Sequence, residues 1–310
     1  MTEQTPTIPR PSRLGAFIRR NPVALKELRG RMRGPRAFIV LTVYVALMSL
    51  FTVVLYLIYA TSRTVMLSTT GGVIGKLIFG GIVAVELFLV CFIAPAFTAG
   101  AISGERERRT FNLLRTTLLP AHRLVLGKLL SALAYIVLLL MVAVPLQSLA
   151  FLMGGVSIGE VLLSVELLLV TAIGYGAAGL YFSAAMKRTL TASILTYTFA
   201  LVMTVALPIG VMVLAPFVLS SSLWNSALLH GVAVIVFGLL ASTNPISTAV
   251  LTEVVLLEKS SAFYFTQSLA GGVMLPLVSP WVVYTVLYLL GSLVLVLLTV
   301  RAVRRTQASD

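Results

Sequence analysis

Six long apolar runs constrain this chain of 310 residues more than any other feature of its sequence. A helix rises 1.5 Å per residue, so about 20 apolar residues cross the ~30 Å hydrocarbon core of a bilayer. The runs cover residues 37–60, 73–102, 124–152, 158–186, 190–219 and 281–300. Only 11% of the residues are charged, against about a quarter in soluble domains. The sequence therefore predicts an all-α, polytopic membrane bundle with six spans and excludes a soluble catalytic domain.

The basic residues predict how these spans are oriented. A formal net charge of +13 would suggest nucleic-acid binding in a soluble protein. Here, 20 of the 23 Lys and Arg lie before span one, between spans two and three or in the first turns of span three, between spans four and five, or after span six. With an even span count these segments share one side, which the positive-inside rule makes cytoplasmic. We expect a multi-pass protein of the plasma membrane (the bacterial inner membrane), with both termini cytoplasmic and no nucleic-acid partner.

The number of spans is less certain from the apolar runs in the outer region, residues 220–280, than elsewhere in the chain. Residues 224–241 are apolar enough for a seventh span, but crossing there would move the C-terminal arginines outside. Because Pro245 disfavours helix at Asn244, we expect two half-helices forming a re-entrant or outward-facing hairpin between spans five and six. A weak extra span over 263–278 is the alternative.

The two ends of the chain differ from this transmembrane domain, residues 37–300. Residues 1–12 contain three prolines and predict a disordered tail, and residues 301–310 predict a short cytoplasmic tail. Residues 13–36 mix arginines with apolar side chains, which is typical of an interfacial helix among anionic headgroups. A basic flank that only sets topology is the alternative for this segment.

The cytoplasmic loop 103–123 predicts a second amphipathic helix. Ser103 is placed to cap it, Glu105 and Glu107 fall in its first turn where the helix dipole favours acids, and Pro120 ends it. Its apolar face would consist of Thr110, Leu113, Leu114 and Leu118. Such a face suits docking onto a soluble partner as well as resting on the membrane.

This loop resembles the signature of the type 2, export-class permease subunits of ATP-binding-cassette (ABC) transporters. The matching residues are Gly104-Glu105-Arg106-Glu107, Thr110, Leu113-Leu114, Thr117, Pro120, Arg123 and Gly127-Lys128, followed by a long apolar span. The basic N-terminal "elbow" helix, the six spans and the outer re-entrant element are also similar to the family's layout. Phe111 and Asn112 depart from it, because the family more often has Leu and Glu there.

The resemblance implies a permease subunit of an ABC exporter, without its own ATPase site. The loop helix would be a coupling helix that contacts a separately encoded ATPase subunit through Glu105, Arg106, Glu107, Arg109, Thr110, Leu113 and Leu114. The elbow helix would add contacts through Lys26, Arg29 and Arg33. Two permease subunits, identical or different, and two ATPase subunits would form the complex, with ATP and Mg²⁺ in the ATPase subunits. An apolar or amphipathic cargo is preferred, because no charged pocket is visible in the sequence.

Motifs for other chemistry are few. The chain has no P-loop, one cysteine and two histidines, so we expect no cofactor, metal or disulfide in this chain and no enzyme activity of its own. The string Gly155-Val156-Ser157-Ile158-Gly159 matches a serine-hydrolase pattern that His230 and Glu160 could complete. A tight turn between two helices explains the same string.

Two carboxylates lie more than a turn inside the predicted spans, Glu86 in the second and Glu166 in the fourth. A charged residue there costs roughly 2.5–3.5 kcal/mol on insertion scales and normally faces a cavity or a partner. Both are candidates for the substrate path. The alternative function is an ion- or proton-coupled secondary transporter that uses them. Span four also carries Gly174, Gly176 and Gly179, which predict close approach of a neighbouring helix.

Overall fold

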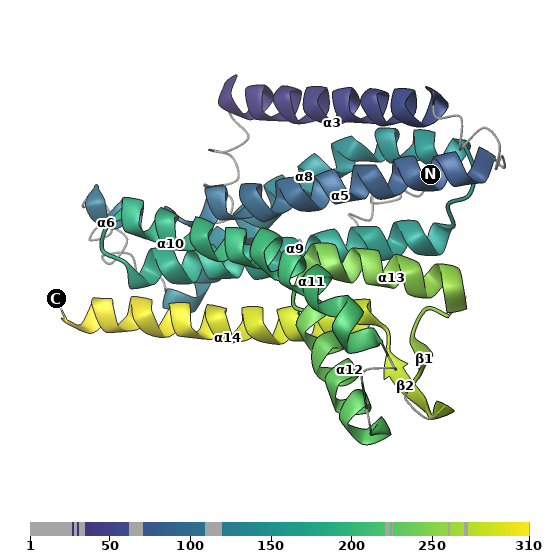
Figure 1. Ribbon diagram of the computed structural model, residues 1–310. Helices are drawn as coiled ribbons and strands as arrows, with labels where there is room; N and C mark the ends of the chain where they lie inside the picture. The colour runs from purple at the N-terminus through teal and green to yellow at the C-terminus, as the bar shows by residue number, and fades with distance from the viewer. Residues whose placement is uncertain are drawn as a thin grey trace, which may run out of the picture.

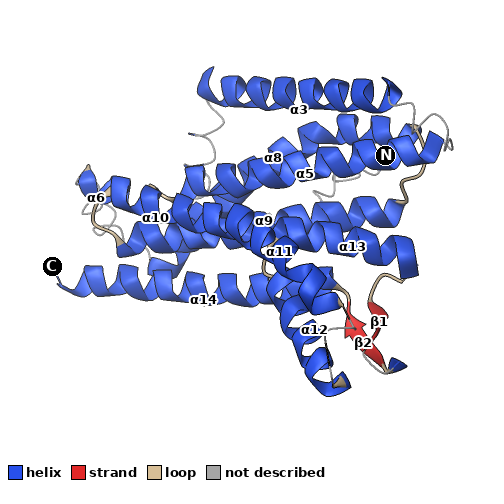
Figure 2. Ribbon diagram, viewed as in Figure 1, coloured by secondary structure: helices blue, strands red, loops and turns tan. Residues whose placement is uncertain are grey.

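Six long helical segments run back and forth through the computed structural model, at the positions of the six apolar runs (Figures 1 and 2). They are α3 (Pro35–Thr61), α5 (Gly71–Thr98), α8 (Ala121–Leu152), α9 (Ile158–Ala185), the segment from α10 (Thr189–Leu201) to α11 (Leu207–Leu219), and α14 (Pro280–Ser309). All six are long and apolar enough to cross a membrane. The prediction of a multi-pass membrane protein is therefore confirmed.

The structure describes residues 35–61, 71–108, 120–220, 226–259, 261–269 and 272–309, together with positions 27, 30 and 224. The predicted tail 1–12 and almost all of the predicted elbow 13–36 lie outside the described residues. So do residues 109–119 of the loop between spans two and three.

Helix α9 forms the centre of the bundle and packs against α5, α8, α10 and α14. The glycines of α9 allow this packing, as the sequence predicts: a Cβ added at Gly179 would lie 2.1 Å from Thr98 Oγ1 of α5. A Cβ at Gly174 would lie 2.4 Å from the Tyr288 ring of α14. The close partners of α9 are therefore helices of the same chain. Helix α3 lies at the edge of the bundle and exposes most of its apolar side chains (Figure 1).

The fifth span is interrupted by a π-helix, Val202–Ala206, in which the N–H of Leu207 bonds to the carbonyl of Val202. Pro208 follows directly, and a proline has no N–H to donate and its ring clashes with the carbonyl four residues earlier. The wider π turn avoids an α-helical register that Pro208 disfavours. Thr204 within it bonds to Tyr175 Oη of α9 at 3.1 Å.

Two short helices, α12 (Ala227–Ala241) and α13 (Pro245–Lys259), follow the fifth span and meet at a turn containing Asn244. The Asn244 side-chain amide donates to the carbonyl of Met203 in the π-helix, and its Oδ1 accepts from the N–H of Ser247 at 2.9 Å. Tyr288 of α14 donates to the carbonyl of Thr243 at 2.9 Å. The turn is therefore held against the middle of spans five and six.

Residues 263–278 are not a weak extra span. They contain two antiparallel strands, β1 (Tyr264–Ser268) and β2 (Met274–Val278), paired from Tyr264–Val278 to Ser268–Met274. The segment is too short for a helix that crosses the hydrocarbon core, and Gly272 adopts φ +78° at the turn, a conformation that favours glycine. The fold is otherwise all-α in the described ranges.

Candidate functional site

The short helix α6 (Ser103–Glu107) lies between spans two and three, at the end of the bundle where α14 ends (Figure 1). The prediction that Ser103 caps it is wrong, because Ile102 is the N-cap and no side chain of α6 supplies the capping bond. Instead, Ser183 Oγ of α9 accepts from the N–H groups of Ile102 at 2.9 Å and Ser103 at 3.0 Å. A neighbouring span therefore satisfies N–H groups that a helix start leaves without intrahelical partners.

Glu105 joins α6 to α8 through a shared lysine. Lys128 Nζ lies 2.8 Å from Glu105 Oε1 and 2.8 Å from Glu27 Oε1, and only 2% of the Lys128 side chain is exposed. Two carboxylates surround this buried ammonium group and offset the cost of removing it from water. Glu27, from the N-terminal segment, thereby meets the same lysine as α6.

Arg106 and Glu107 join α6 to two further helices. Arg106 donates to the carbonyl of Ala184 at the end of α9 at 2.9 Å. Glu107 accepts from the backbone N–H of Thr189 at 2.8 Å and from its hydroxyl at 2.7 Å. Thr189 is the first residue of α10, where the helix dipole favours an anion. We call residues 103–108 with Lys128, Ser183 and Thr189 the α6 junction.

The structure brings three of the predicted coupling residues together in this junction: Glu105, Arg106 and Glu107. Arg109, Thr110, Leu113, Leu114, Lys26, Arg29 and Arg33 lie outside the described residues. The sequence did not predict the contacts that Ser183 and Thr189 make with α6, and it indicated Lys128 only as part of the loop pattern. Of these three residues, only Lys128 could have been predicted to have a partner, since a lysine within an apolar run needs a carboxylate nearby.

Glu86 and Glu166, the two carboxylates of the predicted spans, have different partners. Glu86 of α5 is fully buried and accepts from Gln147 Nε2 of α8 at 2.7 Å. Glu166 of α9 accepts from the Thr285 hydroxyl of α14 at 2.6 Å. Each contact joins two spans, so both residues have a structural role whether or not they serve transport.

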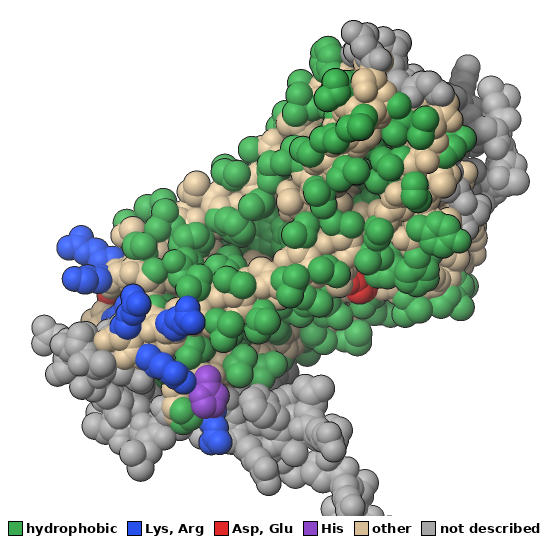
Figure 3. Space-filling model, turned by 90° about the horizontal axis from the view of Figure 1, so that it is seen from below, with side chains coloured by type: hydrophobic (Ala, Val, Ile, Leu, Met, Phe, Trp, Pro, Cys, Tyr) green, Lys and Arg blue, Asp and Glu red, His purple; other side chains and the backbone are tan. Residues whose placement is uncertain are grey.

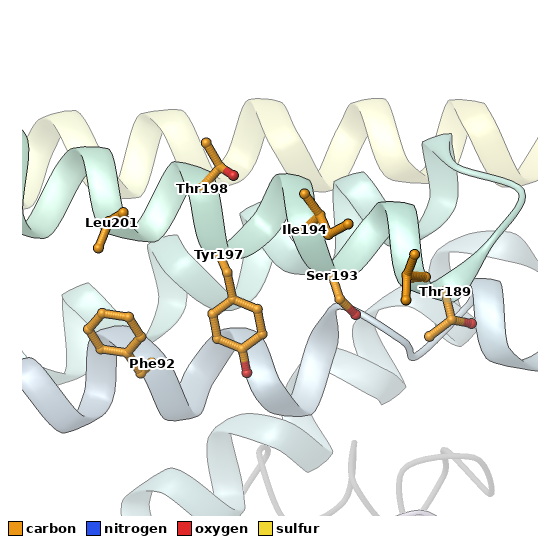
Figure 4. A pocket seen from close by; sticks show the side chains of 8 residues that line it. Phe92, Thr189, Ser193, Ile194, Tyr197, Thr198 and Leu201 are labelled. Atoms are coloured by element: carbon orange, nitrogen blue, oxygen red, sulfur yellow. The ribbon is translucent and has the colours of Figure 1, made fainter.

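An apolar groove of about 670 Å³ lies along α10, beside α5 (Figure 4). It is lined by Phe92, Thr189, Leu190, Ser193, Ile194, Tyr197, Thr198 and Leu201. Figure 4 shows Tyr197 of α10 pointing toward α5 beside Phe92, and the two rings stack with centroids 6.5 Å apart. The groove begins at Thr189, the residue that Glu107 holds, so the α6 junction and the groove share one residue.

The opposite end of the bundle carries the serine of the hydrolase-like string. Ser157 is the N-cap of α9: its Oγ accepts from the N–H of Glu160 at 3.2 Å, and Glu160 Oε2 accepts from the N–H of Ser157 at 3.1 Å. Gly154 and Gly155 adopt φ values of 86° and 83° in the same turn. These contacts support the turn interpretation of the string. His230 stacks on Trp224, with centroids 5.7 Å apart.

Lys76 connects three helices at that end. Its Nζ lies 2.8 Å from Glu160 Oε1 of α9 and 3.1 Å from Glu253 Oε1 of α13. The side chains remain partly exposed, so the pairs are partly screened by solvent. These ion pairs therefore contribute little to the free energy of unfolding, and their main effect is to hold α13 beside α5 and α9.

Neither a protein-family model nor a curated protein matches this sequence. The resemblance of the loop to ABC permeases therefore stays a prediction.

Proposed function

We propose that this chain is the permease subunit of an ABC exporter, which uses ATP hydrolysis by a separately encoded ATPase subunit to move an apolar or amphipathic cargo outward. The observation that carries the proposal is the α6 junction. Three consecutive charged residues of α6 each bond to a different helix: Glu105 to α8, Arg106 to α9 and Glu107 to α10.

This arrangement suits the transmission of force from a soluble subunit to the spans. A partner that moved α6 would act on α8, α9 and α10 together, because each is attached to α6 by a polar contact of 2.9 Å or less. Packed helices respond to such a displacement by rigid-body shifts rather than by continuous deformation. The ATPase subunit would supply ATP and Mg²⁺, and this chain would supply the moving spans.

The charge distribution supports cytoplasmic placement of the junction. On the face of the molecule seen in Figure 3, the Lys and Arg side chains lie at one end, and hydrophobic side chains cover most of the rest. The described basic residues at this end come from α6, the start of α8, the turn between α9 and α10, and the end of α14. By the positive-inside rule, we place this basic end and both chain termini on the cytoplasmic side of the plasma membrane.

Helices α12 and α13 fit a re-entrant hairpin on the outer side. Each has 15 residues, or about 22 Å, which is too short to cross a ~30 Å hydrocarbon core. Their connecting turn bonds to Met203, near the middle of the fifth span. Backbone breaks at this depth are tolerated where protein satisfies the polar groups, and Asn244 does so here.

The groove along α10 supports a second permease subunit as partner. Leu190, Ile194 and Leu201 are each more than half exposed and recur on one face of α10. A second subunit facing this stripe would close the groove into a pathway lined by Phe92, Tyr197 and the hydroxyls of Ser193 and Thr198. Such a lining suits apolar or amphipathic cargo.

The experiment that tests the proposal is site-specific photo-crosslinking in cells, with mass spectrometry to identify whether the adduct is a P-loop ATPase. A photoreactive amino acid replaces either Arg108, which is exposed next to α6, or Ile158, which is exposed at the opposite end of α9. We expect an adduct with the ATPase from position 108 and none from position 158. Equal labelling from both positions would contradict the proposed docking end.

A second measurement tests coupling rather than contact. Glu107→Ala removes both bonds to Thr189, so we expect the permease to bind the ATPase but to change its hydrolysis rate less than the native chain does. Lys187→Ala, another exposed change at the same end, is the matched control and should leave the rate unchanged. A native rate for Glu107→Ala would show that this link to α10 is not part of the coupling.

The complete burial of Glu86 favours a second candidate function, an ion- or proton-coupled secondary transporter that uses Glu86 and Glu166. Glu86→Gln separates the two. Its amide oxygen still accepts from Gln147, so we expect unchanged thermal stability and unchanged ATPase stimulation if the role is structural. A proton flux in vesicles that depends on the native chain and is abolished by Glu86→Gln would favour the secondary transporter.

A further inference from the structure

The β1–β2 hairpin presents an apolar face outside the spans. Phe263, Tyr264, Met274 and Val278 are each more than half exposed. The outer face of the two paired strands consists of the apolar Tyr264, Met274, Pro276 and Val278 and the hydroxyl-bearing Thr266 and Ser268. The other face is half-buried, and Leu269, which follows β1, lies against Gly231 of α12. Figure 1 places the hairpin beside the end of α13 and the start of α14, away from the basic end.

The absence of charged residues around the hairpin is inconsistent with an ordinary water-exposed loop. Between Lys259 and Arg301 the sequence contains no Asp, Glu, Lys, Arg or His. A surface hairpin in water normally alternates an apolar inner face with a polar outer face. Here both faces carry large apolar side chains.

The unpaired backbone groups of the hairpin are inconsistent with a position in the hydrocarbon core of the bilayer. In a two-stranded ribbon, half of the N–H and C=O groups point away from the partner strand. Such open edges do not occur in contact with lipid chains, because no hydrogen-bond partner is available there. Water or lipid headgroups are needed at the edges, while the outer face needs an apolar contact.

Both requirements are met only at the boundary between headgroups and chains. We propose that the β1–β2 hairpin lies in the headgroup region of the outer leaflet, with Tyr264, Met274 and Val278 against the lipid. The aromatic side chains fit this depth: Phe263 contacts Trp281 with ring centroids 5.4 Å apart, and the Trp281 indole N–H donates to the carbonyl of Ala262 at 2.6 Å. Trp and Tyr are enriched at membrane interfaces because their rings have an apolar body and a polar group.

The test uses nitroxide labels in the full chain, reconstituted in phosphatidylcholine–phosphatidylglycerol vesicles. In a Cys91→Ala background, single cysteines replace Met274 or Val278. Two controls are Lys187→Cys, which is exposed at the basic end, and Leu293→Cys, which is exposed midway along α14. Spin relaxation by oxygen, which partitions into lipid, is compared with relaxation by a water-soluble nickel chelate.

We expect the oxygen-to-nickel ratio at Met274 and Val278 to lie between the ratios of the two controls. A ratio equal to that of Lys187→Cys would place the hairpin in water, and a ratio equal to that of Leu293→Cys would place it among the lipid chains. Strong spin–spin broadening would show that a second copy covers the face. Each of these results would overturn the proposal.

Trp281 provides a measurement that needs no cysteine variant. In Trp224→Phe, its fluorescence should be quenched more strongly by lipids spin-labelled near the headgroup than by lipids labelled near the chain end. Absence of quenching by either lipid would also refute the interfacial position.

Discussion

At the scale of single residues, Gly75 shows how little space the bundle leaves at its outer end. A Cβ added at Gly75 would lie 2.2 Å from the carbonyl oxygen of Gly154 and 2.9 Å from that of Ala150, both in the backbone where α8 turns into α9. We expect Gly75→Ala to destabilise the protein by about 1–3 kcal/mol, the usual cost of overpacking, and to lower its melting temperature in detergent.

Gly80 is the matched control, because it lies on the same helix and no described atom comes within 4 Å of an added Cβ. Gly80→Ala should be neutral or gain up to about 1 kcal/mol from helix propensity. Equal melting temperatures for the two variants would mean that α5 and the α8–α9 turn are not in close contact.

The same scale shows which site residues a sequence can reveal. Glu105, Arg106 and Glu107 were predicted because they form a local pattern, and the structure brings them together. Ser183 was not, because it lies 80 residues after Ser103 and carries no distinguishing neighbour in the chain. The cap assigned to Ser103 failed for the related reason that α9 supplies the acceptor. Contacts between spans depend on packing, which periodicity does not encode.

At the scale of elements, the break between α12 and α13 depends on two bonds of one side chain. Asn244→Ala removes both the donor to Met203 and the cap of α13. A lost cap costs about 1 kcal/mol, and a buried carbonyl without a donor about 1–3 kcal/mol more. We expect a clear fall in melting temperature for Asn244→Ala.

Asn244→Ser divides that loss into its two parts. A serine hydroxyl still caps α13 but is too short to reach Met203, so its melting temperature should lie between those of the native chain and Asn244→Ala. If Asn244→Ser matched the native chain, the tether to the π-helix would contribute nothing to stability.

The bounds of the long helices could be predicted from the sequence better than the π-helix and the strands of the outer region. The apolar runs give the long helices to within four residues, since hydropathy and length determine whether a helix can span. The exception is α14, which continues nine residues beyond the predicted end at residue 300. The π-helix was missed, because Pro208 could equally have produced a kink in an α-helix. Residues 263–278 were open to a helical reading because they are apolar, but the strand pairing depends on a turn at Gly272.

At the scale of the whole molecule, six crossings would place both chain termini at the same end of the bundle, and the positive-inside rule would make that basic end cytoplasmic. In a Cys91→Ala background, we expect single cysteines at Lys187 and Arg304 to react with a membrane-impermeant maleimide only when the cytoplasmic face is opened. Cysteines at Ser157 and Ser261 should react in intact cells. The physical reason is that Lys187 and Arg304 belong to the basic end, whereas Ser157 and Ser261 lie at the other. Reaction of Arg304→Cys but not of Lys187→Cys in intact cells would require an odd number of crossings between the two positions, and reaction of both would contradict the cytoplasmic orientation of the basic end.

The cap that Ser183 supplies to α6 also sets an order of events during synthesis. Ser183 is translated 80 residues after Ser103, a delay of roughly 4 to 16 s at 5–20 residues per second. Until α9 has entered the membrane, α6 lacks the acceptor for its first N–H groups, and Arg106 lacks the carbonyl of Ala184. A nascent chain therefore completes the α6 junction only after its central span is in place, so an incomplete chain lacks contacts that the mature junction has.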